Sequence, residues 1–66
     1  MSFSSFVSHV LALIERAGGG ISVKFSEEDN GKFIAYCSDG TQIIGNSTSL
    51  KLTARFGSDH QAQFVA

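Results

Sequence analysis

The sequence contains no proline, no tryptophan and only one cysteine, Cys37. A single cysteine excludes a disulfide within the chain. One cysteine with two histidines also argues against a structural zinc site, which needs a fuller set of such ligands. We therefore expect neither a disulfide nor a metal to stabilise the fold, and no motif in the sequence predicts a cofactor.

Long apolar runs are absent as well, since no segment approaches the roughly 20 residues that cross a bilayer. The formal net charge is -1 and 17% of the residues are charged, which argues against disorder and against a tail that wraps nucleic acid. The N-terminus has neither the basic region nor the small-residue cleavage site of a signal peptide. Together with the free thiol, these features favour a cytoplasmic protein with no membrane partner.

A chain of 66 residues is expected to form a single compact domain, 1–66. A domain of this size buries only about 60% of the surface that its unfolded chain exposes, so its stability is marginal. Small natural domains are often stabilised by disulfides, by a metal or by association with another chain. Because the composition argues against the first two, we expect self-association or docking onto a partner.

The apolar residues near the N-terminus recur at the spacing of an amphipathic helix, which we predict over residues 3–17. Ser2 or Ser4 can cap its N-terminus. Gly18–Gly20 can end it, because glycine adopts the left-handed conformation of a helix C-terminus without steric cost. A phosphate-binding glycine loop would precede a helix rather than follow it. The predicted apolar stripe consists of Phe3, Phe6, Val7, Val10, Leu11, Ile14 and Ala17, with Leu13 near its boundary.

After the glycines the apolar period changes to two, which is typical of half-buried strands. Short turns join these segments, so adjacent antiparallel pairing is the economical topology. We therefore predict an α+β fold in which the N-terminal helix packs on one face of a four- to five-stranded antiparallel meander. Short twisted strands also leave open a sheet that rolls toward a small barrel. The predicted strands cover residues 21–27, 32–37, 41–45, 50–56 and 61–65.

The pairing of the first two strands depends on the loop over residues 29–31. A two-residue loop would place Phe25 opposite Tyr36. A three-residue loop with a glycine bulge would place Phe25 opposite Ala35, and this slip would exchange the two faces of the second strand. We favour the bulged loop. It predicts that three side chains of the second strand point toward the helix, namely those of Phe33, Ala35 and Cys37.

The same alternation orients the fourth strand. Gly45–Asn46–Ser47 indicates a turn before it, because these residues are typical of turns. The side chains expected to point inward from this strand are those of Leu50, Leu52, Ala54 and Phe56.

The sequence offers few candidates for catalysis. Cys37 with His9 or His60 could form a nucleophile and a base, but no residue nearby would orient the pair. A cysteine in an apolar strand is far more often a small buried hydrophobic residue. The acidic residues 27–29 lack the alternating ligands of a calcium loop. We expect no catalytic residues, no metal ligands and no enzymatic activity.

The face of the sheet that points away from the helix is more informative. In the preferred register it carries Lys24, Lys51 and Arg55 together with Tyr36, and no acidic residue. A basic sheet surface with a stacking aromatic ring is how several small modules bind single-stranded nucleic acid. Lysine and arginine are also ordinary outward residues of a solvated antiparallel sheet, so the pattern alone does not require a ligand.

Ile34 and Ile44 are expected on the same outer face, where they would form an exposed apolar stripe with Tyr36. Contiguous exposed apolar surface usually marks a partner site. If the register slips by one residue, these side chains belong to the core instead. We predict a non-catalytic protein-interaction or regulatory module, a homodimer or an accessory subunit. The alternative is a nucleic-acid-binding module that uses the basic outer face.

Overall fold

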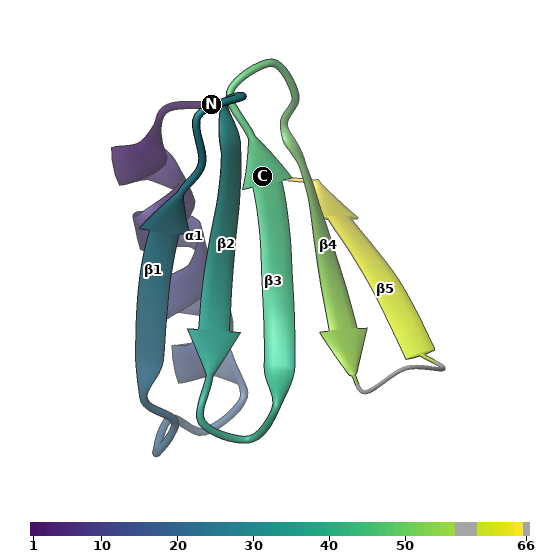
Figure 1. Ribbon diagram of the computed structural model, residues 1–66. Coiled ribbons are helices and arrows are strands. Elements are labelled where there is room, and N and C mark those ends of the chain that lie inside the picture. The colour runs from purple at the N-terminus through teal and green to yellow at the C-terminus, as the bar shows by residue number, and fades with distance from the viewer. Residues whose placement is uncertain (57–59, 66) are drawn as a thin grey trace.

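The computed structural model describes residues 1–56 and 60–65. One helix is followed by five strands, which form a single antiparallel sheet in the order β1-β2-β3-β4-β5 (Figure 1). The predicted α+β fold with a helix on an antiparallel meander is confirmed. The sheet is open, with β1 and β5 at its two edges, so it does not close into a barrel. The elements are α1 (Phe3–Arg16), β1 (Val23–Glu27), β2 (Lys32–Cys37), β3 (Thr41–Asn46), β4 (Lys51–Phe56) and β5 (His60–Val65).

Both ends of α1 have the caps that the sequence predicts. The backbone N–H of Ser5 donates to Ser2 Oγ at 3.1 Å, which makes Ser2 the N-cap. At the other end the N–H of Gly19 donates to the carbonyl of Ile14 at 3.0 Å, and Gly18 has φ +104°. This is the Schellman arrangement, which requires a left-handed residue after the C-cap. The helix has 14 residues, and within residues 1–56 and 60–65 no helix has the length and hydropathy of a membrane span.

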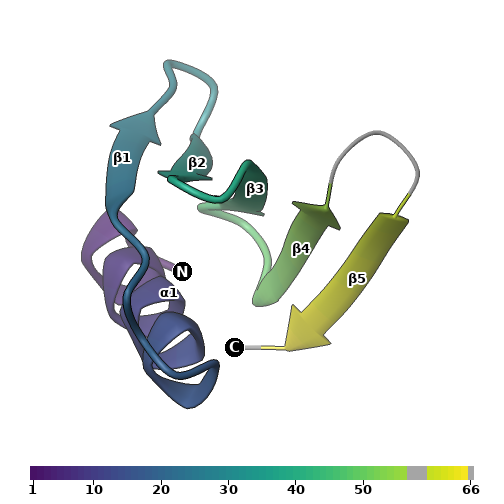
Figure 2. The ribbon, with the colours of Figure 1, turned by 90° about the horizontal axis from the view of Figure 1, so that it is seen from below.

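The helix lies against the inner face of the sheet, where β2 and β3 contact it, and the sheet curves toward the helix side (Figure 2). Four phenylalanine rings form the centre of this layer, with neighbouring ring centroids 5.4–6.5 Å apart. These rings are those of Phe3, Phe6, Phe25 and Phe33. The buried residues around them are Val10, Ala35, Ile43, Leu52 and Ala54.

The apolar stripe of the helix differs from the prediction at three positions. Leu11 is 48% exposed and Ala17 is exposed as well, whereas Leu13 packs against the core. Successive helical residues are rotated by about 100°, so Leu11 points about 100° away from the buried Val10 and Leu13 only about 60° away. The helix therefore faces the sheet along a line closer to Leu13 than the spacing alone indicated.

The β1–β2 hairpin has the bulged loop that we favoured from the sequence. The N–H of Glu28 donates to the carbonyl of Lys32 at 2.7 Å, which leaves three residues in the loop, and Gly31 has φ +80°. As predicted, Phe25 pairs with Ala35. The inner face of β2 consequently carries Phe33 and Ala35, both buried, and the half-buried Cys37.

The connection between β3 and β4 differs from the prediction. Gly45 and Asn46 are the last residues of β3 rather than part of a turn. Gly45 is buried, and a Cβ atom there would lie 2.8 Å from Phe6 Cδ1, so glycine is required by the close approach of the ring. Leu50 precedes β4 and is 57% exposed instead of pointing inward. The bond from the N–H of Lys51 to Ser49 Oγ forms a local turn there, which keeps Leu50 out of the strand ladder.

Two other residues predicted to point inward from β4, Leu52 and Ala54, are buried as expected. The side chain of Phe56 and the predicted turn at residues 57–59 lie outside the described residues. The predicted fifth strand is present, and its backbone pairs with β4 from Phe56↔His60 to Lys51↔Val65.

Candidate interaction face

The outer face of the sheet is organised by a row of side chains that runs across the strands. Lys24 pairs with Tyr36, and Tyr36 pairs in turn with Gln42. Gln42 then pairs with Arg55. Directly opposed residues of neighbouring strands point to the same face of a sheet. The row therefore places the Tyr36 ring between two cationic side chains on one surface.

A second row supplies the apolar part of this face. Ile34 pairs with Ile44, and Ile44 pairs with Thr53. Ile44 is half-buried, while Tyr36 is 43% exposed. These positions confirm that the three apolar residues of the predicted stripe share the outer face.

The predicted exposure of Ile34 is wrong, because its side chain is only 9% exposed. Strand β2 is an interior strand, with Ser26 and Ile44 directly opposite Ile34 on its two sides. Neighbouring strands lie about 4.8 Å apart, so flanking side chains cover a branched residue even on a solvated face. Ile34 therefore offers little contact surface itself.

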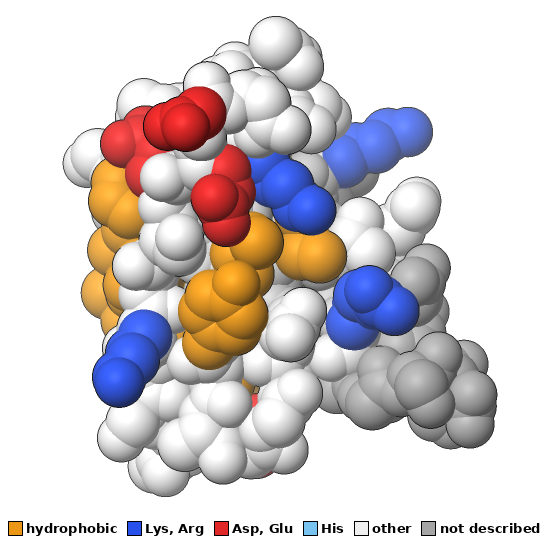
Figure 3. Space-filling model, in the orientation of Figure 1, with side chains coloured by type: hydrophobic (Ala, Val, Ile, Leu, Met, Phe, Trp, Pro, Cys, Tyr) orange, Lys and Arg blue, Asp and Glu red, His pale blue; other side chains and the backbone are white. Residues whose placement is uncertain are grey.

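Four cationic side chains surround this apolar centre, and all four are exposed. Figure 3 shows the arrangement, with orange apolar atoms near the middle of the face, blue cationic groups around them and red acidic groups along the upper border. Three of them were predicted, namely Lys24, Lys51 and Arg55. Lys32 was missed, although it lies two residues before Ile34 in β2 and therefore on the same face. The outer-face patch consists of Lys24, Lys32, Ile34, Tyr36, Ile44, Lys51 and Arg55.

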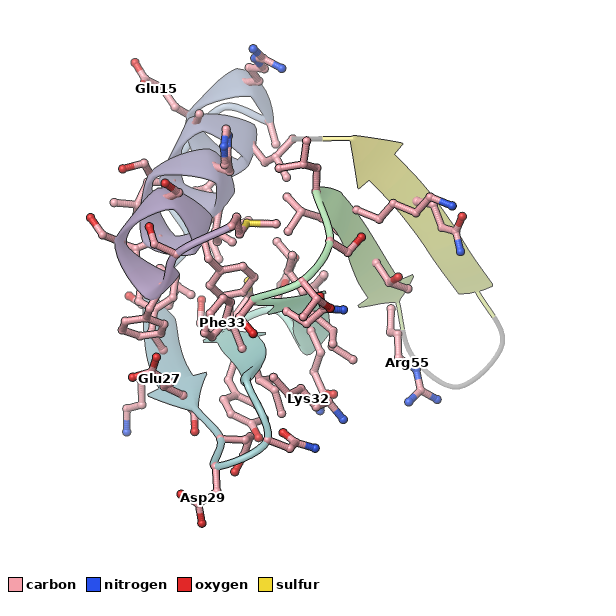
Figure 4. The ribbon with its side chains drawn as sticks, turned by 90° about the horizontal axis from the view of Figure 1, so that it is seen from above. Glu15, Glu27, Asp29, Lys32, Phe33 and Arg55 are labelled. Atoms are coloured by element: carbon pink, nitrogen blue, oxygen red, sulfur yellow. The ribbon has the colours of Figure 1, made fainter. Side chains whose placement is uncertain are left out.

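The two faces of β2 are separated clearly in the side-chain view. Phe33 points toward the helix, whereas Lys32 and Arg55 project from the opposite side of the sheet (Figure 4). Asp29 lies at the tip of the β1–β2 hairpin, and Glu15 lies on the helix. No acidic residue occupies an outer-face position in the described strands. Four of the five lysines and arginines of the chain thus share a surface whose strand positions carry no carboxylate, while Glu28 and Asp29 of the adjoining hairpin loop lie beside Lys32.

The chemistry of Cys37 differs from that of a reactive thiol. Burial raises the pKa of the Cys37 thiol, and the nearby Asp39 carboxylate raises it further. The thiol is therefore protonated at neutral pH, whereas a nucleophilic cysteine needs a lowered pKa. Asp39 accepts a hydrogen bond from the N–H of Thr41 at 2.9 Å, and this bond lowers the pKa of the Asp39 carboxyl. Within the part of the chain that the structure describes, no cluster of His, Cys, Asp and Glu could hold a metal ion.

Comparison of the chain with protein-family models, with curated proteins and with solved structures gave no match.

Proposed function

We propose that the protein is a non-catalytic interaction module that binds a partner protein through the outer-face patch. The observation that carries this proposal is an exposed aromatic ring, Tyr36, in a partly apolar centre with four exposed cations around it. Protein interfaces have this anatomy, since aromatic residues concentrate at their centres and polar residues form the rim. Tyrosine and arginine are also the residues that most often contribute large shares of binding energy.

The size of the face is sufficient for such a contact. The described surface of the molecule is 4301 Å². A typical specific interface covers about 800 Å² on each partner, which is roughly a fifth of that surface. One face of a five-stranded sheet can supply this area. The cationic rim further specifies the partner, because complementary charge favours an acidic surface.

The same charges bear on the predicted homodimer. A two-fold contact between two outer faces would bring like-charged side chains together, because both copies present the same patch. The repulsion of desolvated like charges disfavours such a contact. The patch is therefore better suited to a different, acidic protein, which corresponds to the accessory-subunit form of the prediction. Self-association would use the edge strands β1 or β5 instead.

A nucleic acid is the second candidate, and the row across the sheet is the observation that favours it. Tyr36 lies between Lys24 and Arg55 in that row, which would allow one base to stack between two phosphate contacts. Binding to single strands through four cations would lower the logarithm of the association constant by about 3 for each tenfold increase in salt concentration. Among the described side chains Tyr36 is the one aromatic ring on the face, and for this reason we place this function second.

A peptide-display selection tests the proposal with a defined probe. A random peptide library is selected on the wild-type protein, and the affinities of the recovered peptides are measured by fluorescence anisotropy. We expect acidic peptides with an apolar anchor. Their affinity should fall at least about tenfold for Tyr36→Ala, because a central aromatic residue is removed.

Leu11→Ala is the matched control, because Leu11 is exposed to a similar degree but lies on the helix. It should leave the affinity within about twofold, as expected of a residue outside the interface. Recovered peptides that bind Tyr36→Ala as tightly as wild type would contradict the proposal. Salt-sensitive binding of a 20-nucleotide oligothymidylate that depends on Tyr36, without peptide binding, would favour the nucleic-acid function instead.

A further inference from the structure

A cavity of about 370 Å³ opens at the end of the molecule where α1 ends, on the side of the sheet opposite the outer-face patch. The elements around it, the last turn of α1 and strands β2, β3 and β4, are seen from below in Figure 2. Among the described residues, its walls are almost entirely apolar. The apolar residues that line it are Leu13, Ile14, Ala17, Ile21, Cys37, Ile43 and Ala54.

This space is a concavity open to solvent, so the apolar side chains that line it lie next to water. Apolar surface in contact with water lacks the favourable free energy that its burial would contribute. A chain of 66 residues has little stability with which to compensate for that loss. An occupant that covers this apolar surface would therefore stabilise the fold as well as bind.

The volume and shape of the cavity suit a small molecule. Ligand sites usually enclose about 300–1,000 Å³ and are lined mainly by apolar side chains. If each non-hydrogen atom takes roughly the 30 Å³ of a liquid water molecule, the space holds about 12 such atoms. A docked protein would need a surface of about 800 Å², which a concave site of this size does not provide.

The polar residues of the cavity specify the head group. Arg16 and Asp39 contribute opposite charges, and Thr41 adds a hydroxyl group. Because these charges balance, the site gives no net attraction to an ion. A charged head group would also lose hydration beside the apolar walls. A neutral group such as a hydroxyl can either accept from the guanidinium or donate to the carboxylate.

We propose that this cavity binds a small neutral amphiphile, an apolar chain or ring of about ten non-hydrogen atoms that carries one hydroxyl or amide group. Binding places the apolar body between α1 and the inner face of β3 and β4, and the polar group near Arg16 and Asp39. This site is separate from the outer-face patch, so either can exist without the other.

Methyl NMR with 1-octanol as the probe tests the site directly. Three isoleucines line the cavity, namely Ile14, Ile21 and Ile43, whereas Ile34 and Ile44 lie on the outer face. We expect the methyl signals of the first group to shift with saturation during the titration. The signals of Ile34 and Ile44 serve as internal controls and should remain nearly unchanged. Shifts of equal size in both groups, or no saturable shift, would overturn the proposal.

A pair of variants distinguishes binding of 1-octanol in the cavity from a general effect of the alcohol on Tm. Ala17 is exposed at the cavity wall, so Ala17→Leu places a larger side chain in the space without disturbing the buried core. Ala12→Leu makes the same change at an exposed helix position outside the cavity. For wild type and Ala12→Leu, 1-octanol at about 100 times Kd should raise Tm by about 10–20 °C. For Ala17→Leu the increase should largely disappear. Equal increases in all three proteins would overturn the site.

The head group is tested with octanoate and octylammonium at constant ionic strength. We expect both to bind about tenfold more weakly than 1-octanol, because the balanced charges of Arg16 and Asp39 give no net attraction and a charged group loses hydration beside the apolar walls. Tighter binding of either ion would contradict the neutral class. If Ala17→Leu instead changes the solution mass of the ligand-free protein, the cavity belongs to a contact between copies and the ligand proposal fails.

Discussion

The two faces of the sheet are built from the same strands but differ in what surrounds their side chains. On the inner face Phe33 is 2% exposed and contacts the rings of Phe3 and Phe6. On the outer face Tyr36, three residues later in the same strand, is 43% exposed. The inner face therefore determines whether the chain folds, and the outer face is free to bind. Substitutions on the two faces should consequently affect different measurements.

The strongest contrast is expected between the two aromatic residues of β2. Phe33→Ala should lower the free energy of unfolding by about 3–5 kcal/mol, because it leaves a cavity among buried rings. A domain of this size has a total stability of only about 3–10 kcal/mol, so this variant should be largely unfolded or close to it. Tyr36→Ala should cost less than about 1 kcal/mol. Urea unfolding followed by circular dichroism compares the two, and equal losses would contradict the assignment of faces.

A smaller effect is expected at the glycine of β3. A Cβ atom at Gly45 would lie 2.8 Å from Phe6 Cδ1 and 3.0 Å from Leu52 Cδ2. Gly45→Ala should therefore destabilise the fold by about 1–3 kcal/mol, as other overpacked substitutions do. Gln42→Ala, on the outer face of the same strand, should change stability by only about 0.5 kcal/mol. An unchanged or raised urea midpoint for Gly45→Ala would show that the inner face is less tightly packed than the structure indicates.

The helix cap gives a third, more modest test of the inner layer. Ser2→Ala removes the acceptor for the N–H of Ser5 and should cost about 1 kcal/mol. Ser4 lies inside the exposed part of α1, so Ser4→Ala should be neutral or slightly stabilising, since alanine favours helices. Thermal unfolding of both variants checks the difference. If Ser4→Ala lost stability and Ser2→Ala did not, the N-cap would be Ser4, and the assignment of Ser2 as the cap would be wrong.

The smallest expected effect is a pH dependence that originates at Cys37. Burial and the Asp39 carboxylate raise the thiol pKa in the folded state. The unfolded thiol titrates near about 8.5. The stability contributed by the neutral thiol is therefore fully present below that pH and is lost as pH rises toward the folded pKa. The urea midpoint should fall between about pH 7 and pH 10 by more for wild type than for Cys37→Ala. Parallel curves would contradict the raised pKa.

Much of the fold could be predicted because local patterns and the required burial agree. The helical spacing ended at glycines that can take positive φ, and the bulge at Gly31 set the register that places Phe33 inside. The errors occur where tertiary contacts override a local preference. Gly45 has the composition of a turn residue but serves as space for the Phe6 ring. Leu50 has the correct alternation but lies before the strand begins.

The candidate site was predicted in outline for the same reason. Alternation alone placed Tyr36 and the predicted cations on one face, and it would also have placed Lys32 there. Exposure could not be derived in this way, since the burial of Ile34 depends on side chains from two neighbouring strands. The cavity near Ala17 was out of reach, because it depends on how far the helix extends across a curved sheet.

The most direct test of the account compares two charge reversals that change the net charge equally. Arg55→Glu alters the outer-face patch, and Arg16→Glu alters the only lysine or arginine elsewhere in the chain. The affinity of an acidic peptide selected on wild type is measured for both by fluorescence anisotropy at about 0.15 M salt. We predict a loss of at least about tenfold for Arg55→Glu and less than about twofold for Arg16→Glu. Equal losses would show that only net charge matters, and the outer face would then not be the binding surface.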